Sequence, residues 1–284
     1  MEAAKHHEQN YTKIIEEALK QAKIPLNKLD LVAYSAGPGL GPCLRVGIQA
    51  INTIQKNYKI PFIGVNHCVA HLEVGKIVTK AKDPVLLYAS GANTQIIAYE
   101  AGKYRIFGET LDMGIGNFLD SFARYIKLGF PGGPKISKLA EESNNYIQLP
   151  YSVKGMDVSF TGMLTNLKQK YDSKRYKKED LAYSAQETAF AMLIEVAERA
   201  MAHCNKNELL LGGGVACNKR LQEMAKIMCK ERGAKCFIPE NEFLLDNAAM
   251  IALTGLRMYQ GNHRTTKLEI YPYQRTDDIK VDWI

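Results

Sequence analysis

The sequence predicts an α/β protein of one large or two moderate domains, and two observations support that prediction. Short apolar runs typical of buried strands alternate along the chain with longer segments of helical periodicity. The chain has 284 residues, of which 46% are hydrophobic and 24% are charged. Such a composition is typical of a globular protein large enough to bury a substantial core.

The first part of the chain predicts strands that each run into a helix. "LDLVAYS" is an apolar strand followed by the glycine turn "AGPGLGP", and "PFIGV" is the next strand. Asn66 stands directly after that strand at the position of an N-cap, so we expect a helix to begin at His67. The other helices expected here cover residues 2–22 and 45–56.

The pattern changes after Pro84. "VLLYASGANTQIIAYEAGKYRIFGETLD" predicts a β-meander of three short strands with tight turns at "SGAN" and "EAGK". Beyond it we expect helices near 116–128, 133–143, 184–203 and 246–261, a basic segment over 166–181, and a strand, glycine turn and helix over 207–228. We place a lobe boundary near residue 82: residues 1–82, with 265–284 returning to them, form one lobe and residues 83–264 form the other.

Composition and charge narrow the functional class. The sequence has no apolar run near the roughly 20 residues that cross a bilayer, and "MEAAKHHEQN" does not resemble a signal peptide. Its six cysteines form no C-x-x-C pair, which favours reduced thiols over disulfides or a zinc knot. We therefore expect a cytoplasmic protein. The net charge of +7 favours contact with an anionic partner without identifying one.

His67 and His71 are four residues apart in "GVNHCVAHLEVGK", so on a helix both imidazoles share one face and can bind the same ion. The alternative is that one or both histidines cap the helix or pack against it. A zinc peptidase of the H-E-x-x-H type is disfavoured, because Cys68 stands where the catalytic glutamate would be. Asp246 and Tyr88 are further candidate ligands that spacing alone does not establish.

Glycine turns suggest a second kind of site. "LLLGGGVACNKR" runs from a strand through Gly212–Gly214 into a helix, and "ASGANT" and "FPGGPK" are two similar turns. Such turns let a phosphate or nucleotide lie against backbone amides, although tight chain reversal alone also explains them. The basic run at Lys168, Lys170, Lys174, Arg175, Lys177 and Lys178 either contacts nucleic-acid phosphates or is a solvated helix end.

Nine motifs together resemble a known family. They are "GPGLGPCLRVG", "GVNHCVAH", "LYASGANTQ", "GETLDMGIGNFLD", "FPGGP", "YSVKGMDVSFTG", "SAQETAF", "GGGVACNKRL" and "LLDNAAM". Their order and spacing are similar to those of the universal tRNA threonylcarbamoyladenosine transferase family, formerly called O-sialoglycoprotein endopeptidase or glycoprotease. "PYSVKGMDVSF" and the ending "RTDDIKVDWI" resemble the archaeal and eukaryotic branch, the catalytic subunit of the KEOPS complex.

The resemblance implies an actin-like ATPase fold of the sugar kinase, Hsp70 and actin class, with two lobes. It implies transfer of a threonylcarbamoyl group from threonylcarbamoyl-adenylate to the exocyclic amine of the adenosine beside the anticodon, in tRNAs reading codons that begin with A. The implied ligands are ATP or the adenylate and one divalent ion per subunit, iron being favoured over zinc or magnesium. The implied partners are tRNA and other KEOPS subunits, including a small kinase and a small dimerising subunit, with no membrane and no DNA.

The resemblance also implies residue roles. His67, His71 and Asp246 would bind the metal, with Tyr88 as an additional or substrate-facing ligand. The phosphate or acyl group would face the turn made of Tyr88, Ala89, Ser90, Gly91 and Ala92, and the adenosine would be held by Asp120, Gly133 and Asn218. From residue type alone, Asp120 is equally well a helix cap or dipole partner, and Asn218 a helix-start amide.

Three features depart from the family pattern. The "SGGNT" turn is "SGANT" here, so Ala92 adds a methyl group, and "DNGAM" is "DNAAM", which places Ala248 near the expected ligand. The family's leading hairpin with its G-x-E-G-T phosphate motif has no counterpart, so we expect an N-terminally incomplete first lobe. A start assigned too late, strands supplied by a separate chain, and an inactive copy are the three explanations, and we favour the first. A catalytically impaired scaffold subunit is the alternative function, with a metallopeptidase or a kinase-like phosphotransferase less favoured.

Overall fold

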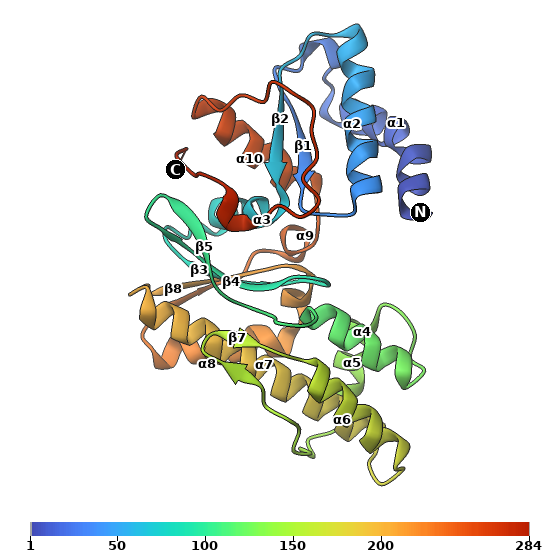
Figure 1. The fold of residues 1–284 in the computed structure, drawn as a ribbon, viewed down its shortest axis with the longest axis vertical. Helices are drawn as coiled ribbons and strands as arrows, with labels where there is room; N and C mark the ends of the chain where they lie inside the picture. Colours follow the sequence, from blue (N-terminus) through green and yellow to red (C-terminus); the bar gives the residue numbers. More distant parts are fainter. Residues whose placement is uncertain (1, 284) are drawn as a thin grey trace. The chain divides into compact units, whose positions relative to one another are not determined.

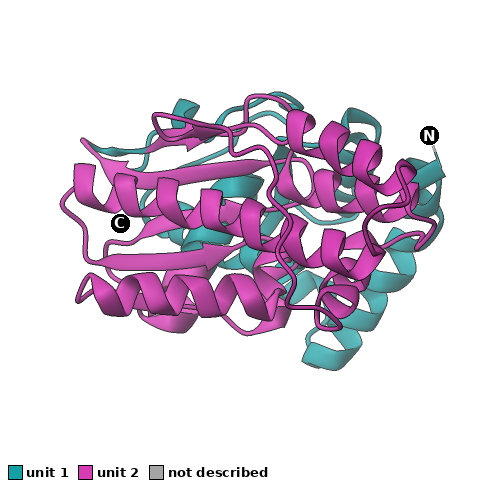
Figure 2. Ribbon diagram, turned by 90° about the horizontal axis from the view of Figure 1, so that it is seen from below, with its two compact units in different colours: residues 1–74, 102–104, 247–284 teal, residues 75–101, 105–246 magenta. Residues whose placement is uncertain are grey.

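The computed structural model describes residues 2–283, and the chain divides into two compact units (Figure 2). Unit 1 comprises residues 1–74, 102–104 and 247–284, and unit 2 comprises residues 75–101 and 105–246. The sequence placed the boundaries at residues 82 and 265. The chain returns to unit 1 at Asn247 rather than at residue 265, because the helix after Asn247 packs against the two strands of unit 1. Among the helices of residues 2–283, none combines the length and apolar composition needed to cross a membrane.

Unit 1 is built on two parallel strands (Figure 1). Its elements are α1 (Glu2–Ala22), β1 (Val32–Gly37), α2 (Gly41–Asn57), β2 (Phe62–Asn66), α3 (His67–Thr79, shared with unit 2 from Gly75) and α10 (Ala248–Gln260), with 3-10 turns at Leu26–Lys28 and Thr276–Asp278. The pairing of β1 with β2 shifts between Ser35 and Gly37. A Cβ on Gly255 would lie 2.6 Å from that of Ala33, so this glycine lets α10 approach β1 closely.

Unit 2 is built on a five-stranded sheet in the order β5-β4-β3-β8-β9. Its strands are β3 (Val85–Ala89), β4 (Thr94–Glu100), β5 (Lys103–Glu109, whose first two residues belong to unit 1), β8 (Glu208–Gly212) and β9 (Lys235–Phe237), with a small hairpin of β6 (Val153–Lys154) and β7 (Asp157–Val158). Strand β3 pairs antiparallel with β4 and parallel with β8. The predicted meander is therefore confirmed as the β5-β4-β3 half of this sheet.

Helices pack around a large apolar core in unit 2. They are α4 (Ile115–Tyr125), α5 (Gly132–Ala140), α6 (Thr161–Asp172), α7 (Lys178–His203), α8 (Lys219–Glu231) and α9 (Asn241–Leu244), with a 3-10 turn at Gly214–Cys217. Helix α7 contacts α5, α6, α8 and β3, so apolar side chains are buried around most of its circumference. The basic segment is resolved into the end of α6, a short turn and the start of α7.

Candidate functional site

The two histidines lie at the start of α3, where the sequence placed them. The side-chain oxygen of Asn66 accepts hydrogen bonds from the backbone N–H groups of Cys68 at 3.0 Å and Val69 at 3.1 Å. This cap ends β2 and begins the helix at His67, as predicted. The rings of His67 and His71 are therefore neighbours on one face, with centroids 4.9 Å apart and planes inclined by 77°.

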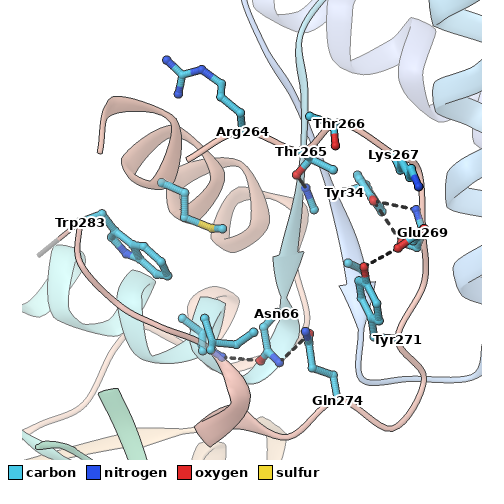
Figure 3. A pocket seen from close by; sticks show the side chains of 15 residues that line it. Tyr34, Asn66, Arg264, Thr265, Thr266, Lys267, Glu269, Tyr271, Gln274 and Trp283 are labelled. Atoms are coloured by element: carbon cyan, nitrogen blue, oxygen red, sulfur yellow. Dashed lines mark hydrogen bonds between the residues drawn. The ribbon is translucent and has the colours of Figure 1, made fainter. Parts of the chain in front are cut away.

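A distant segment fixes the capping residue. The amide nitrogen of Asn66 donates a hydrogen bond to Oε1 of Gln274 at 3.2 Å (Figure 3), and the backbone N–H of Gly64 donates to the hydroxyl of Thr265 at 3.0 Å. These contacts border a cavity of about 300 Å³ between the strands of unit 1 and its C-terminal segment. Sequence reasoning missed Gln274, because no local pattern marks a partner 208 residues away.

Asp246 stands where the chain passes from unit 2 back to unit 1, directly before Asn247. The side-chain oxygen of Asn247 accepts a hydrogen bond from the N–H of Met250 at 2.8 Å and so caps α10. The ligand atoms of His67, His71 and Asp246 lie within 4.8 Å of one another. The structure thus brings the two histidines together with the aspartate that the sequence named as a candidate.

This donor set fits a divalent cation. Nitrogen and oxygen ligands bind such ions at about 2.0–2.2 Å, so ligands of one ion are separated by about 3–4 Å. The observed spacing needs only small side-chain rotations to reach that range. Two imidazoles and one carboxylate, with no thiolate, form a set that suits iron or zinc. His71 is buried, His67 is half-buried and Asp246 is exposed.

The predicted fourth ligand lies on the central sheet of unit 2. Tyr88 is in β3, opposite Gln95 of β4 and Gly212 of β8, and only 1% of its surface is exposed. Ala89 follows it and is fully buried. The role of Tyr88 in metal or substrate binding stays a prediction.

The turn after β3 is held tightly. The N–H of Ser90 donates to the carbonyl of Asn93 at 2.9 Å, which closes the turn. The first residues of α4 lie against it, because the N–H groups of Gly116 and Asn117 donate to the carbonyls of Ser90 at 3.1 Å and Gly91 at 2.9 Å. Gly91 and Ala92 nevertheless remain exposed, so this turn offers backbone to a ligand.

Close approach explains two glycines around this turn. A Cβ on Gly116 would lie 2.7 Å from Cα of Gly91, and one on Gly213 would lie 2.4 Å from the carbonyl oxygen of Ala89. Gly213 also has φ of +87°, a conformation that other residues rarely adopt. The glycines of "GIGNF" and "LLLGGGV" therefore pack against the turn between β3 and β4, which the sequence alone did not show.

Asp120 and Gly133 lie at the junction of α4 and α5. Oδ1 of Asp120 accepts a hydrogen bond from the N–H of Gly132 at 2.6 Å, so the carboxylate caps the start of α5. Gly132 has no room for a side chain here, since its Cβ would lie 2.8 Å from the same oxygen. The helix-partner interpretation of Asp120 is thus realised, and Gly133 follows in the first turn of α5.

Asn218 is the N-cap of α8. Its oxygen accepts from the N–H groups of Arg220 at 2.8 Å and Leu221 at 3.3 Å, and its amide nitrogen donates to Gln186 of α7 at 2.9 Å. The helix-start interpretation is therefore also realised. Gln186, which orients this amide, was missed, although "SAQETAF" was among the motifs noted.

A bidentate ion pair fixes the same helix start. Nε and Nη2 of Arg220 each bond a carboxylate oxygen of Glu187 at 2.7 Å, and this hydrogen-bonded pairing raises the pKa of Arg220. Helices α7 and α8 are thereby locked together where Asn218 begins α8.

Comparison with known proteins places these features in a family. The family model described as tRNA N6-adenosine threonylcarbamoyltransferase matches residues 1–253. The enzyme of that name from Thermococcus sibiricus is 54% identical over 284 residues, covering 99% of this chain and 87% of the relative. A probable bifunctional tRNA threonylcarbamoyladenosine biosynthesis protein from Methanocaldococcus jannaschii is 51% identical over 100% of this chain and 53% of its own length.

Solved structures support the fold. HypF from T. kodakarensis matches with a TM-score of 0.70 and 13% identity, over 92% of this chain and 44% of that one. At that identity the likeness shows the fold alone, which is the predicted actin-like α/β class. On the family match and the close relatives, the chain belongs to the tRNA N6-adenosine threonylcarbamoyltransferase family of transferases.

Proposed function

We propose that this protein transfers a threonylcarbamoyl group from threonylcarbamoyl-adenylate to the exocyclic amine of the adenosine beside the anticodon, in tRNAs that read codons beginning with A. The amine nitrogen attacks the carbonyl carbon, the bond from that carbon to the phosphate oxygen breaks, AMP leaves with the electron pair, and the amine loses a proton. The observation that carries the proposal is the convergence of His67, His71 and Asp246 within 4.8 Å.

In this proposal those three residues hold one divalent cation, with Tyr88 as an additional or substrate-facing ligand. Iron is the favoured ion, and zinc or magnesium are the alternatives. When bound, such a cation would supply Lewis-acid polarisation of the carbonyl group under attack. Asn66 contributes by fixing the start of α3, so that both imidazoles are already oriented before the ion binds.

We propose that the turn from Tyr88 to Ala92 binds the phosphate or acyl part of the adenylate, and that Asp120, Gly133 and Asn218 hold its adenosine. The exposed backbone of Gly91 and Ala92 supports the first assignment. A carboxylate accepts several hydrogen bonds, so the bond from Gly132 leaves Asp120 able to accept from ribose hydroxyls as well. Asn218 likewise has a second N–H for a base or sugar oxygen.

We further propose that the protein acts in the cytoplasm within a KEOPS-like complex, with a small kinase and a small dimerising subunit as partners. The motifs of the archaeal and eukaryotic branch support this assignment. The name of the bifunctional relative from Methanocaldococcus jannaschii, half of which this chain matches, is consistent with a second activity acting beside this one.

The test is transfer in a reconstituted system. Unmodified tRNA transcript, labelled threonine and the enzyme that makes the adenylate are combined with the full chain and its partner subunits. We expect His67→Ala with His71→Ala to lower transfer at least about hundredfold, because a metal site loses its function without its ligands. The matched control is His6→Ala with His7→Ala, since these two exposed histidines lie on α1.

The alternative function is a non-catalytic scaffold subunit. The engagement of Asp120 and Asn218 in helix capping is the observation that favours it. A scaffold predicts equal transfer by the wild type, the α3 histidine variant and the α1 control. That result would refute the catalytic proposal.

A further inference from the structure

Near the C-terminal ends of α4 and α6, three lysines lie over tyrosine rings. Nζ of Lys168 lies 5.1 Å from the ring centre of Tyr125, and Nζ of Lys174 lies 4.7 Å from that of Tyr171. Nζ of Lys170 lies 4.8 Å from a third tyrosine ring, in the turn after α6. We call the following six residues the basic–aromatic patch: Tyr125, Lys168, Lys170, Tyr171, Lys174 and Tyr176.

Positive charge dominates this part of the surface. The segment 168–178 has six cationic side chains and one acidic side chain, Asp172. That carboxylate accepts a hydrogen bond from the hydroxyl of Tyr125 at 2.5 Å, so it orients an aromatic ring of the patch. Lys174, Arg175 and Lys177 are exposed to solvent. The patch therefore presents a concentrated positive field to an anionic partner.

The rings change what this charge can recognise. Tyr125 and Tyr171 lie edge to face, with centroids 6.1 Å apart and planes inclined by 73°. Cation–π contact is weak at such exposed sites, but it favours positions of the ammonium groups over the rings. Tyr125 is 37% exposed and Tyr176 38%, so both rings are accessible to a partner. Cations held beside accessible aromatic rings suit RNA, whose phosphates bind cations and whose unpaired bases stack.

Helix α4 connects the patch to the turn from Tyr88 to Ala92, which we propose binds the adenylate. The N-terminal end of α4 bonds the carbonyls of Ser90 and Gly91, and its last residue is Tyr125. Helix α4 has 11 residues and is therefore about 16 Å long. Both features belong to unit 2. An RNA stem and loop contacting the patch can thus place one nucleotide near the turn.

We propose that the basic–aromatic patch binds the phosphate backbone and unpaired bases of the tRNA substrate near its anticodon loop, an inference that rests on the proposed function. The proposal assigns to this surface the positioning of the RNA, whereas the residues of the candidate site act on the adenylate. A partner protein with an acidic surface is the competing occupant.

The test is tRNA affinity across a salt series, measured with the full chain and an unmodified tRNA transcript. The patch variant is Lys168→Gln, Lys170→Gln and Lys174→Gln. A charge-matched control in the same unit is Lys226→Gln, Lys230→Gln and Lys235→Gln, since all three lysines are exposed. A second patch variant replaces the same three lysines by arginine, which keeps the charge and shows whether glutamine acts through charge or through misfolding.

We expect the glutamine patch variant to bind tRNA at least about tenfold more weakly at 0.1 M salt, and its plot of log affinity against log salt to flatten by about one unit for each lysine that contacts a phosphate. The control and the arginine variant should bind like the wild type. Equal affinity and slope for the glutamine patch variant and its control would overturn the inference, as would selective loss of binding to an acidic partner subunit with tRNA binding intact. Absence of transfer by the wild type with tRNA bound would instead contradict the proposed function.

Discussion

Nη1 of Arg257 donates a hydrogen bond to Oε2 of Glu73 at 2.8 Å, and this ion pair joins α3 to α10 in unit 1. The hydroxyl of Tyr104 also donates to the carboxylate of Glu73, which is fully buried. Glu73 follows His71 by two residues, and α10 begins two residues after Asp246. The pair thus joins α3, which carries His67 and His71, to α10, which follows Asp246.

Removing the two charges of this pair should have unequal effects. Arg257→Met takes the cation away from a buried carboxylate, which destabilises by about 3 kcal/mol or more. Glu73→Gln instead removes the anion from Arg257, whose side chain is 38% exposed. Water can then hydrate the guanidinium group of Arg257, so we expect a smaller loss of stability, about 1 kcal/mol. Urea unfolding of both variants measures the difference. Equal losses would show that burial of Glu73 does not control the stability of this contact.

Two glycines at the same helical position provide a matched comparison. Gly116 and Gly162 are each the second residue of a helix, α4 and α6, but a Cβ on Gly162 would meet nothing within 4 Å. Gly116→Ala should destabilise by about 1–3 kcal/mol through overpacking against Gly91 and weaken ATP binding. Gly162→Ala should be neutral or stabilise by about 0.5–1 kcal/mol. Urea unfolding and nucleotide titration test this, and equal nucleotide affinity for the two variants would count against a ligand at the turn.

Features encoded by neighbouring residues were predictable from the sequence. Helix α1 has the predicted bounds. Asn66 caps the start of α3, as its position directly after a strand predicted. Helix α2 begins at Gly41 rather than near Arg45, because Pro42 is tolerated in the first turn of a helix and does not delay its start. The two-residue strands of the β6–β7 hairpin were missed, since such short pairings depend on tertiary context rather than on local pattern.

Features that depend on distant partners were not predictable. Glu73 is a charged residue that sequence alone would place on the surface, yet it is buried because its cation lies 184 residues further along the chain. For the candidate site, the spacing of His67 and His71 showed only that they share a helix face. Their approach to Asp246 required the fold, because that residue lies 175 positions after His71 and directly before the N-cap of a different helix, α10.

The pH dependence of stability should involve Asp112, which precedes α4. Burial alone would raise the pKa of Asp112, but hydrogen bonds from the backbone N–H groups of Phe160, Thr161 and Met113 outweigh burial and lower the pKa. A carboxylate with a lowered folded pKa stabilises the protein above its unfolded pKa of about 3.9, and that contribution is lost as pH falls through the folded value.

Asp112→Ala should therefore destabilise at pH 7 by about 1–2 kcal/mol, because the carboxylate accepts from the first N–H groups of α6 as a cap does. The difference from the wild type should shrink as pH falls below 4. Urea unfolding between pH 3 and pH 7 measures it. A difference that is constant over this range would show that ionisation of Asp112 contributes nothing.

Metal binding should raise thermal stability through His71. After chelation, an ion at one hundred times its dissociation constant stabilises the wild type by about 2.7 kcal/mol. His71→Ala removes a buried side chain and lowers the melting temperature by itself, so the informative quantity is the further shift when iron, zinc or magnesium is added. At the same metal concentration, we expect the added metal to leave the melting temperature of His71→Ala unchanged. The double variant His6→Ala with His7→Ala should keep the increase seen in the wild type. An equal shift with His71→Ala would place the ion elsewhere, and no shift in the wild type with any of the three ions would refute a cation site at His67, His71 and Asp246.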